Sequence, residues 1–224
     1  MMHSLIDKIL FHDEHVYDKI QYLPYFNNFC KILFKQYPPS KLPSHIKSLT
    51  MTSDEWEYHI TDLFFPEGLE FIDMGDTQLG SEFPKFPTTL KYLKLPIAYR
   101  YMERISPFSD CVNLETVRMN SHLCHLFGKS LPKKTTTLIL TGMRFIEKGD
   151  IPDHVKNLHI EALLGDVGAE NIPLNIQRLK LCDHAEMDFG LFVRRNMTLI
   201  VNQHHRESIE KLEWGPDFRV EYFD

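Results

Sequence analysis

The sequence has few of the features that mark a secreted, membrane-spanning or metal-binding protein. Its four cysteines, Cys30, Cys111, Cys124 and Cys182, lie far apart, so no paired spacing predicts a zinc site or a disulfide framework. No apolar run reaches the roughly eighteen residues that a membrane helix needs. The first residues lack the apolar core and the cleavage site of a signal peptide. We therefore expect a cytoplasmic protein with reduced thiols and no membrane contact.

Positive charge and catalytic motifs are also scarce. Lys and Arg number 25 against 31 Asp and Glu, a net charge of −6, so no basic field favours nucleic acid. Phosphate loops, GxSxG, HExxH and EF-hand patterns are absent. The cluster of His122, Cys124 and His125 has metal-ligand chemistry but no second cluster to complete a site. We expect no enzyme, no cofactor, no metal and no small-molecule substrate.

The sequence does contain a repeated proline-led phrase, apolar-Pro-x-x-apolar-x-x-apolar-x-apolar. Its prolines follow one another at steps of 23, 21, 45, 20 and 21 residues. The step of 45 hides one more copy at 111–119, in which Cys111 replaces the proline. Beyond the last proline the alternation continues without the leader at 194–202 and 207–215, as terminal repeats often do. The proline-led copies are 42–51, 65–74, 86–95, 131–140, 151–160 and 172–181.

Each phrase predicts a turn followed by a short strand. In the copy at 86–95, Leu93 and Leu95 alternate with Tyr92 and Lys94, so the leucines point inward. The proline suits the turn because it has no N–H to donate to a sheet. By the same register, Leu158 and Leu179 point inward in their copies. One repeat cannot bury its apolar row alone, and stacking the repeats gives an α/β solenoid with a parallel sheet.

Two other architectures fit the same pattern. An ordinary sheet protein could have proline-led strands by chance, and an α/β domain could place a helix between successive strands. The returns at 52–64 and 96–110 are long enough for a short helix or helical turn. Repetition of the sequence itself, and not of the spacing alone, favours the solenoid.

The two ends of the chain follow different patterns. Apolar residues recur at helical spacing before residue 40, with Pro24 as a break, which predicts helices at 3–22 and 25–36. We therefore expect a helical cap at 1–40, the solenoid at 41–202 and a carboxy-terminal cap at 203–224. That last cap should contain a final strand at 218–224, with Trp214 closing the core.

The repeated phrase resembles the FNIP repeat, a leucine-rich-repeat variant found in social amoebae and giant DNA viruses. The resemblance covers about 42–182, and 144–160 is the closest match. Only Phe145 stands near the Phe-Asn pair that names the repeat, and no asparagine follows it. The phrase is also similar to the proline-led leucine-rich repeats of bacterial effectors. The resemblance implies a leucine-rich-repeat solenoid that serves as an interaction scaffold, sometimes joined to an F-box, which 22–34 matches only weakly.

The outward strand positions are the predicted partner-binding residues, because aromatic and arginine side chains commonly anchor protein interfaces. The competing interpretation of the aromatic ones is a simple contact across the sheet. We expect a non-enzymatic scaffold that binds a protein through its sheet face. One alternative is a structural component of a viral particle or large assembly; another is a substrate adaptor in ubiquitin transfer that is recognised through 1–36. The candidate residues are Phe71, Asp73, Tyr92, Lys94, Arg118, His159, Arg178 and Lys180.

Overall fold

The chain forms two compact units, residues 1–114 and 115–224, which we call the amino-terminal and carboxy-terminal units. The structure is a computed structural model that describes residues 9–35, 42–52, 64–75, 83–96, 106–142, 146–161, 168–182, 188–192 and 195–224. Most of the two returns that are long enough for a short helix or helical turn, 52–64 and 96–110, and also Phe145, lie outside these ranges.

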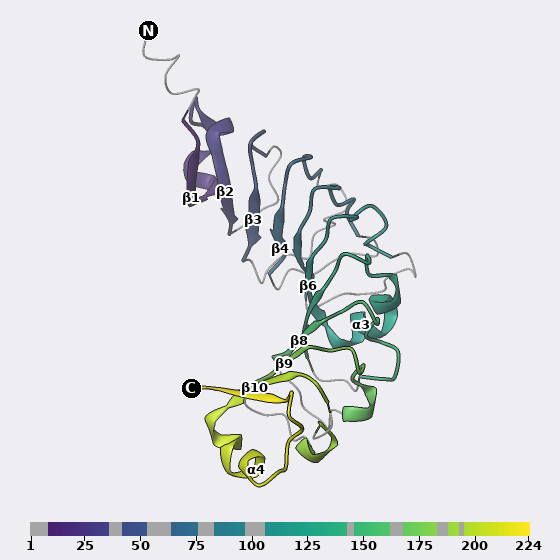
Figure 1. Ribbon diagram of the computed structural model, residues 1–224. Helices are drawn as coiled ribbons and strands as arrows, with labels where there is room; N and C mark the ends of the chain where they lie inside the picture. Colours follow the sequence, from purple (N-terminus) through teal and green to yellow (C-terminus); the bar gives the residue numbers. More distant parts are fainter. Residues whose placement is uncertain are drawn as a thin grey trace. The chain divides into compact units, whose positions relative to one another are not determined.

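Parallel strands make up the amino-terminal unit, and their order in space follows their order in the chain (Figure 1). A short helix, α2 (Tyr17–Ile20), and a 3-10 turn, η1 (Phe26–Asn28), lie between the first two strands. The described strands of this unit are β1 (Phe11–Val16), β2 (Phe29–Phe34), β3 (Ser48–Met51), β4 (Phe71–Asp73) and β5 (Tyr92–Lys94).

The carboxy-terminal unit repeats this arrangement, and its described returns contain more helical turns. In Figure 1 its strands run side by side, and α3 lies in the return that follows β6. The strands are β6 (Thr116–Asn120), β7 (Thr137–Thr141), β8 (Asn157–Ile160), β9 (Arg178–Leu181), β10 (Thr198–Asn202) and β11 (Arg219–Phe223). The returns contain α3 (Ser121–Phe127), η3 (Gly128–Ser130), η4 (Ala169–Asn171), η5 (Phe189–Phe192), η6 (Gln203–His205) and α4 (Arg206–Glu210).

The proline-led phrase has one structural meaning throughout the chain. The proline carbonyl accepts a hydrogen bond from the N–H three residues later, closing a turn directly before each strand. Proline fits there because the turn uses only its carbonyl. In the copy without proline, Leu114 N–H donates to the Cys111 carbonyl at 3.0 Å, so the same turn forms. The six proline turns begin at Pro43, Pro66, Pro87, Pro132, Pro152 and Pro173 and have N···O distances of 2.9–3.3 Å.

Inward residues of neighbouring strands meet in register and form the core of each unit. Leu93 pairs with Ile72 in the amino-terminal unit, and Leu158 pairs with both Leu138 and Leu179 in the carboxy-terminal unit. All of these side chains are fully buried. The predicted inward positions of Leu93, Leu158 and Leu179 are therefore confirmed, as is a parallel α/β arrangement of repeats.

The helices expected at 3–22 and 25–36 are wrong over the described residues 9–35, since 11–16 and 29–34 are strands and α2 spans only four residues. The helical cap expected at 1–40 is therefore not found there, and residues 3–8 and 36 lie outside the described ranges. Ile32 and Phe34 pair with Leu49 and Met51 of β3 and are buried like them. Phe29 N–H donates to the Phe26 carbonyl, which reproduces the proline turn. This segment is thus another copy of the repeat. Helical spacing and strand alternation coincide in so short an apolar run, and pairing with β3 decides between them.

At the other end the predicted last strand is confirmed as β11. The segment at 207–215, which was expected to alternate like a strand, instead begins in helix α4. Trp214 is half-buried and stacks on Phe218 with ring centroids 4.0 Å apart and planes at 7°. The Trp214 indole N–H also donates to the Ile209 carbonyl at 3.1 Å, which ties α4 to the turn before β11.

Candidate functional site

Strand alternation leaves one row of side chains on the outward face of each sheet. Every strand from β3 to β8 and β10 shows buried residues alternating with half-buried ones. The structure divides the eight predicted residues between the two units. Phe71, Asp73, Tyr92 and Lys94 form the amino-terminal face on β4 and β5, while Arg118, His159, Arg178 and Lys180 lie on the carboxy-terminal face on β6, β8 and β9.

The amino-terminal face is built around an aromatic pair. Phe71 and Tyr92 are direct partners in the β4–β5 register, and their rings stack with centroids 4.3 Å apart and planes at 7°. Both side chains remain half-buried. Stacked pairs of this kind contribute about 0.5–1.5 kcal/mol beyond the area that they bury. The contact fixes both rings as a rigid apolar platform that still reaches solvent.

An ion pair lies beside this platform in the next row. Lys94 Nζ is 3.0 Å from Asp73 Oδ1, and the two side chains keep only 17% and 21% of their exposure. Because both side chains are partly buried, water and salt screen their attraction less than they screen an ordinary ion pair on the surface. The Asp73 carboxylate also accepts a hydrogen bond from the Gly75 N–H at 2.7 Å. The neighbouring contacts therefore hold both charges in fixed positions.

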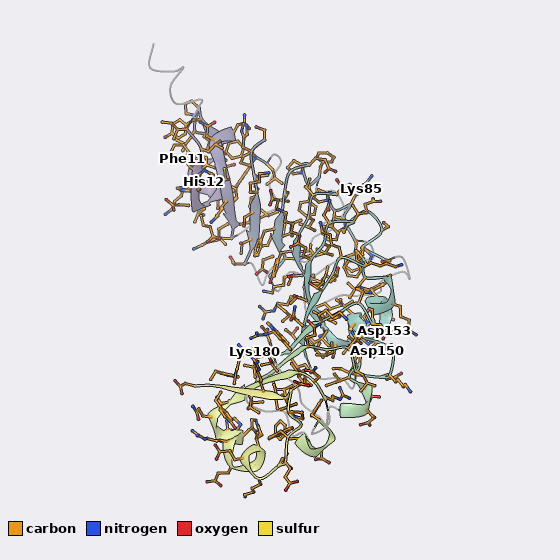
Figure 2. All side chains as sticks on the ribbon, viewed as in Figure 1. Phe11, His12, Lys85, Asp150, Asp153 and Lys180 are labelled. Atoms are coloured by element: carbon orange, nitrogen blue, oxygen red, sulfur yellow. The ribbon has the colours of Figure 1, made fainter. Side chains whose placement is uncertain are left out.

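The carboxy-terminal face has a higher density of charge. Arg118 pairs with Glu161 at 2.5 Å, and Arg178 pairs with Glu221 of β11 at 3.2 Å. Lys180 Nζ lies 4.9 Å from the centre of the Phe223 ring, within the range of a cation–π contact. In Figure 2, Lys180 and Asp150 lie on opposite sides of this unit's sheet. Lys180 is therefore on the open face and Asp150 among the returns.

His159 occupies the middle of the carboxy-terminal face, opposite Lys180 in the β8–β9 register. Its pKa is lowered from the ordinary value, first because half-burial removes water from the imidazolium, and next because Lys180 and Arg178 repel the charge. Glu161 acts in the opposite direction. At neutral pH the imidazole is thus a neutral group among cations.

This shift predicts a pH dependence of stability. The folded pKa lies below the unfolded one, so the contribution of His159 to stability is present above about pH 6.5 and is lost as the pH falls through the folded pKa. Between about pH 7.5 and about pH 5.5, the wild type should lose more free energy of unfolding than His159→Gln. Chemical denaturation of both proteins at each pH measures the difference. If the wild type and His159→Gln lose the same free energy of unfolding, the pKa of His159 is not lowered in the folded protein.

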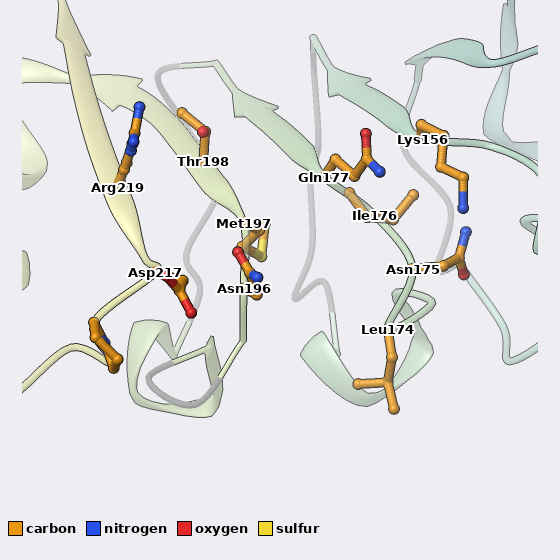
Figure 3. Close-up of a pocket in the computed structure, with 11 residues that line it drawn as sticks. Lys156, Leu174, Asn175, Ile176, Gln177, Asn196, Met197, Thr198, Asp217 and Arg219 are labelled. Carbon is orange, nitrogen blue, oxygen red and sulfur yellow. The ribbon is translucent and has the colours of Figure 1, made fainter.

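A groove that the sequence did not predict lies at the start of β9, β10 and β11, with a volume of 570 Å³. Figure 3 shows Lys156 and Arg219 at its two ends, with Gln177, Asn196 and Thr198 between them. Its residues come from turns and strand starts of successive repeats, where the phrase leaves the side chains variable. No local motif could have indicated it, because the repeats meet only after stacking.

The cluster of His122, Cys124 and His125 is structural in this fold. All three lie on α3; Asn120 caps the helix by accepting from the His122 N–H, and His125 Nδ1 lies 3.1 Å from the Asp150 carboxylate. Burial first, and Asp150 second, raise the pKa of the Cys124 thiol. Burial likewise raises the pKa of Cys111 to about 12. Burial therefore favours the protonated form of both thiols at neutral pH, which is the less nucleophilic form.

The described ranges contain neither a metal-binding cluster nor a membrane-spanning helix. No three metal-ligating side chains come together there. None of the helices described has the length and apolar character needed to cross a bilayer. In comparisons with known proteins, no family model, no curated protein and no solved structure matches the chain.

Proposed function

We propose that the chain is a non-enzymatic leucine-rich-repeat scaffold, of the kind that its FNIP-like phrase predicts, and that it binds a protein partner through its outward sheet faces. The observation that carries the proposal is the stacked pair of Phe71 and Tyr92, half-buried on an open sheet beside the ion pair of Asp73 and Lys94. Rigid aromatic side chains next to fixed charges are typical anchors of protein interfaces.

The repeat architecture supports this use of the face. Parallel strands held in register place the outward side chains in rows about 4.8 Å apart, and each row can be changed without altering the buried leucines behind it. The returns on the other side include helices and 3-10 turns of several lengths. A partner would therefore find the regular surface on the strands, where side-chain identity alone sets specificity.

The test is capture of partners from the native source with purified variants. Tyr92→Ser removes one ring of the platform, while Tyr22→Ser makes the same change at a tyrosine that is 88% exposed and lies outside the face. We expect Tyr92→Ser to reduce capture of a specific partner by about tenfold or more, and Tyr22→Ser to leave it unchanged. Thermal unfolding of both variants checks that they remain folded. Equal capture by the two variants would contradict the proposal.

A further inference from the structure

Lys156, Lys180 and Arg219 are cations on the strands of the carboxy-terminal unit or directly before them. Within the part of the chain that the structure describes, Lys156, Lys180 and Arg219 form no ion pair, whereas Arg118 and Arg178 are neutralised by glutamates. Lys180 is held over Phe223 by a cation–π contact, which leaves its charge uncompensated. Lys156 and Arg219 line the groove. The positive charge of this surface is therefore available to a ligand.

Two of these cations lie at the starts of strands, and the third lies further along its strand. Arg219 is in register with Thr198 and Arg178, so Lys180 lies two residues beyond that row on β9. Lys156 directly precedes β8, Lys180 belongs to β9, and Arg219 begins β11. Figure 3 shows the side chains of Gln177, Asn196 and Thr198 between Lys156 and Arg219. These amides and this hydroxyl can hydrogen-bond to a peptide backbone or to polar side chains. A ligand across the strands would meet a cation at each end of the groove and polar groups between them.

The charges nearest to His159 are mixed, with two cations and one carboxylate. Half-burial first, and then Lys180 and Arg178, lower the pKa of His159, while Glu161 raises it. The Debye length in physiological salt is about 8 Å, so these nearby charges, and not the chain's net charge of −6, set the potential that a bound ligand meets.

We propose that the carboxy-terminal face and its groove bind an acidic peptide segment of the partner, an inference that rests on the proposed function and names the chemistry of the ligand. A nucleic acid fits less well because Glu161, Asp217 and Glu221 are interspersed with the cations and would repel a continuous phosphate backbone. The half-buried Ile139 and Ile200 on the same face also suit peptide side chains better than phosphates.

Strand geometry sets the spacing of the acidic residues. β8 and β11 are three strand steps apart, which is about 14 Å at the usual strand separation. An extended peptide advances about 3.3 Å per residue, so acidic residues about four positions apart reach Lys156 and Arg219 together. Lys180 lies on β9 between these two strands, two residues or roughly 6.6 Å along the strand from the row of Arg219, so a third acidic group on that side of the peptide can contact it.

The experiment uses the full chain and a short fluorescent peptide of serine and threonine with two glutamates about four positions apart. The matched probe has glutamine at both positions. We expect the glutamate peptide to bind more tightly by about tenfold. Lys180→Met and Arg219→Met should each weaken it, while Lys129→Met, an exposed cation in η3, should not. Asp217→Asn removes a repelling carboxylate from the groove and should tighten binding.

His159 supplies a second readout within the same complex. A bound glutamate should raise the pKa of His159, which a proton NMR titration of its imidazole measures. Binding of the glutamate peptide with this shift and this ranking of variants supports the inference. Equal binding of the two peptides, no binding of either, or equal effects of Lys180→Met and Lys129→Met would overturn it.

Two further outcomes separate this inference from the proposed function. If a single-stranded oligonucleotide binds more tightly than the glutamate peptide and depends on Lys180, the ligand is not an acidic peptide and the inference fails. If Tyr92→Ser abolishes partner capture while Lys180→Met and Arg219→Met leave it unchanged, the scaffold function stands and the acidic ligand is overturned.

Discussion

Leu158→Ala is expected to lower the free energy of unfolding by about 2–5 kcal/mol. Leu158 is fully buried and is in register with Leu138 and Leu179 on the strands beside it. Truncation removes apolar contacts with both neighbours and leaves a cavity that the flanking strands cannot fill without losing their register. Urea denaturation followed by circular dichroism measures the loss.

The matched control is Leu174→Ala in the same unit. Leu174 lies in the turn before β9 and is 82% exposed, so the same substitution should change stability by less than about 0.5 kcal/mol. Hydrogen exchange gives a second test. Each repeat contacts only the adjacent repeats, so a local loss of stability should affect mainly those repeats. Loss of protection in Leu158→Ala should be largest in β7, β8 and β9. Similar costs for the two leucine variants would refute the register.

Gly75→Ala should be the other strongly destabilising change, at about 3–4 kcal/mol. Gly75 follows β4 with a φ of +58°, and a Cβ atom there would lie 2.0 Å from the Met51 carbonyl oxygen. That oxygen belongs to the backbone of the preceding strand, β3, so it can move only if the strand moves. The substitution thus combines a left-handed conformation with a clash.

Gly68→Ala separates these two contributions. Gly68 also has a left-handed φ, +99°, yet the nearest atom to an added Cβ is the flexible end of Lys47 at 3.9 Å. Gly68→Ala should therefore lower the free energy of unfolding by only about 1–2 kcal/mol, which is the cost of placing alanine in a left-handed conformation. Thermal unfolding of the two variants gives the comparison. If Gly75→Ala and Gly68→Ala are equally stable, the return after β4 does not contact Met51 as the structure describes.

Much of the fold could be predicted because the same pattern of proline and apolar residues occurs in many copies along the chain. Pro152 begins a turn, Val155 closes it and Leu158 enters the core, and the other copies place equivalent residues in the same way. The repeat at 26–34 escaped detection because Phe26 stands in the place of the proline. Its aromatic residues also fit a helix, and only pairing with β3 resolves the ambiguity.

The candidate site was predictable only in part. Alternation identified Tyr92 and Lys94 as outward residues, yet their partners Phe71 and Asp73 lie 21 residues earlier, and the pairings depend on register. The groove between Lys156 and Arg219 requires four successive repeats to meet. A sequence pattern specifies which face a side chain occupies, but contacts between repeats depend on how the strands align.

The turn that precedes the strand of each proline-led repeat also affects how such a chain can change over evolutionary time. Each proline-led repeat, and the copy that begins at Cys111, enters its strand through the same carbonyl-to-N–H turn and continues the same buried row. A gene that gained or lost one segment of 20–23 codons would therefore encode a chain whose remaining strands still have compatible neighbours. Descendants could lengthen or shorten the recognition surface by duplication or deletion, one row at a time, while the leucine core stayed the same.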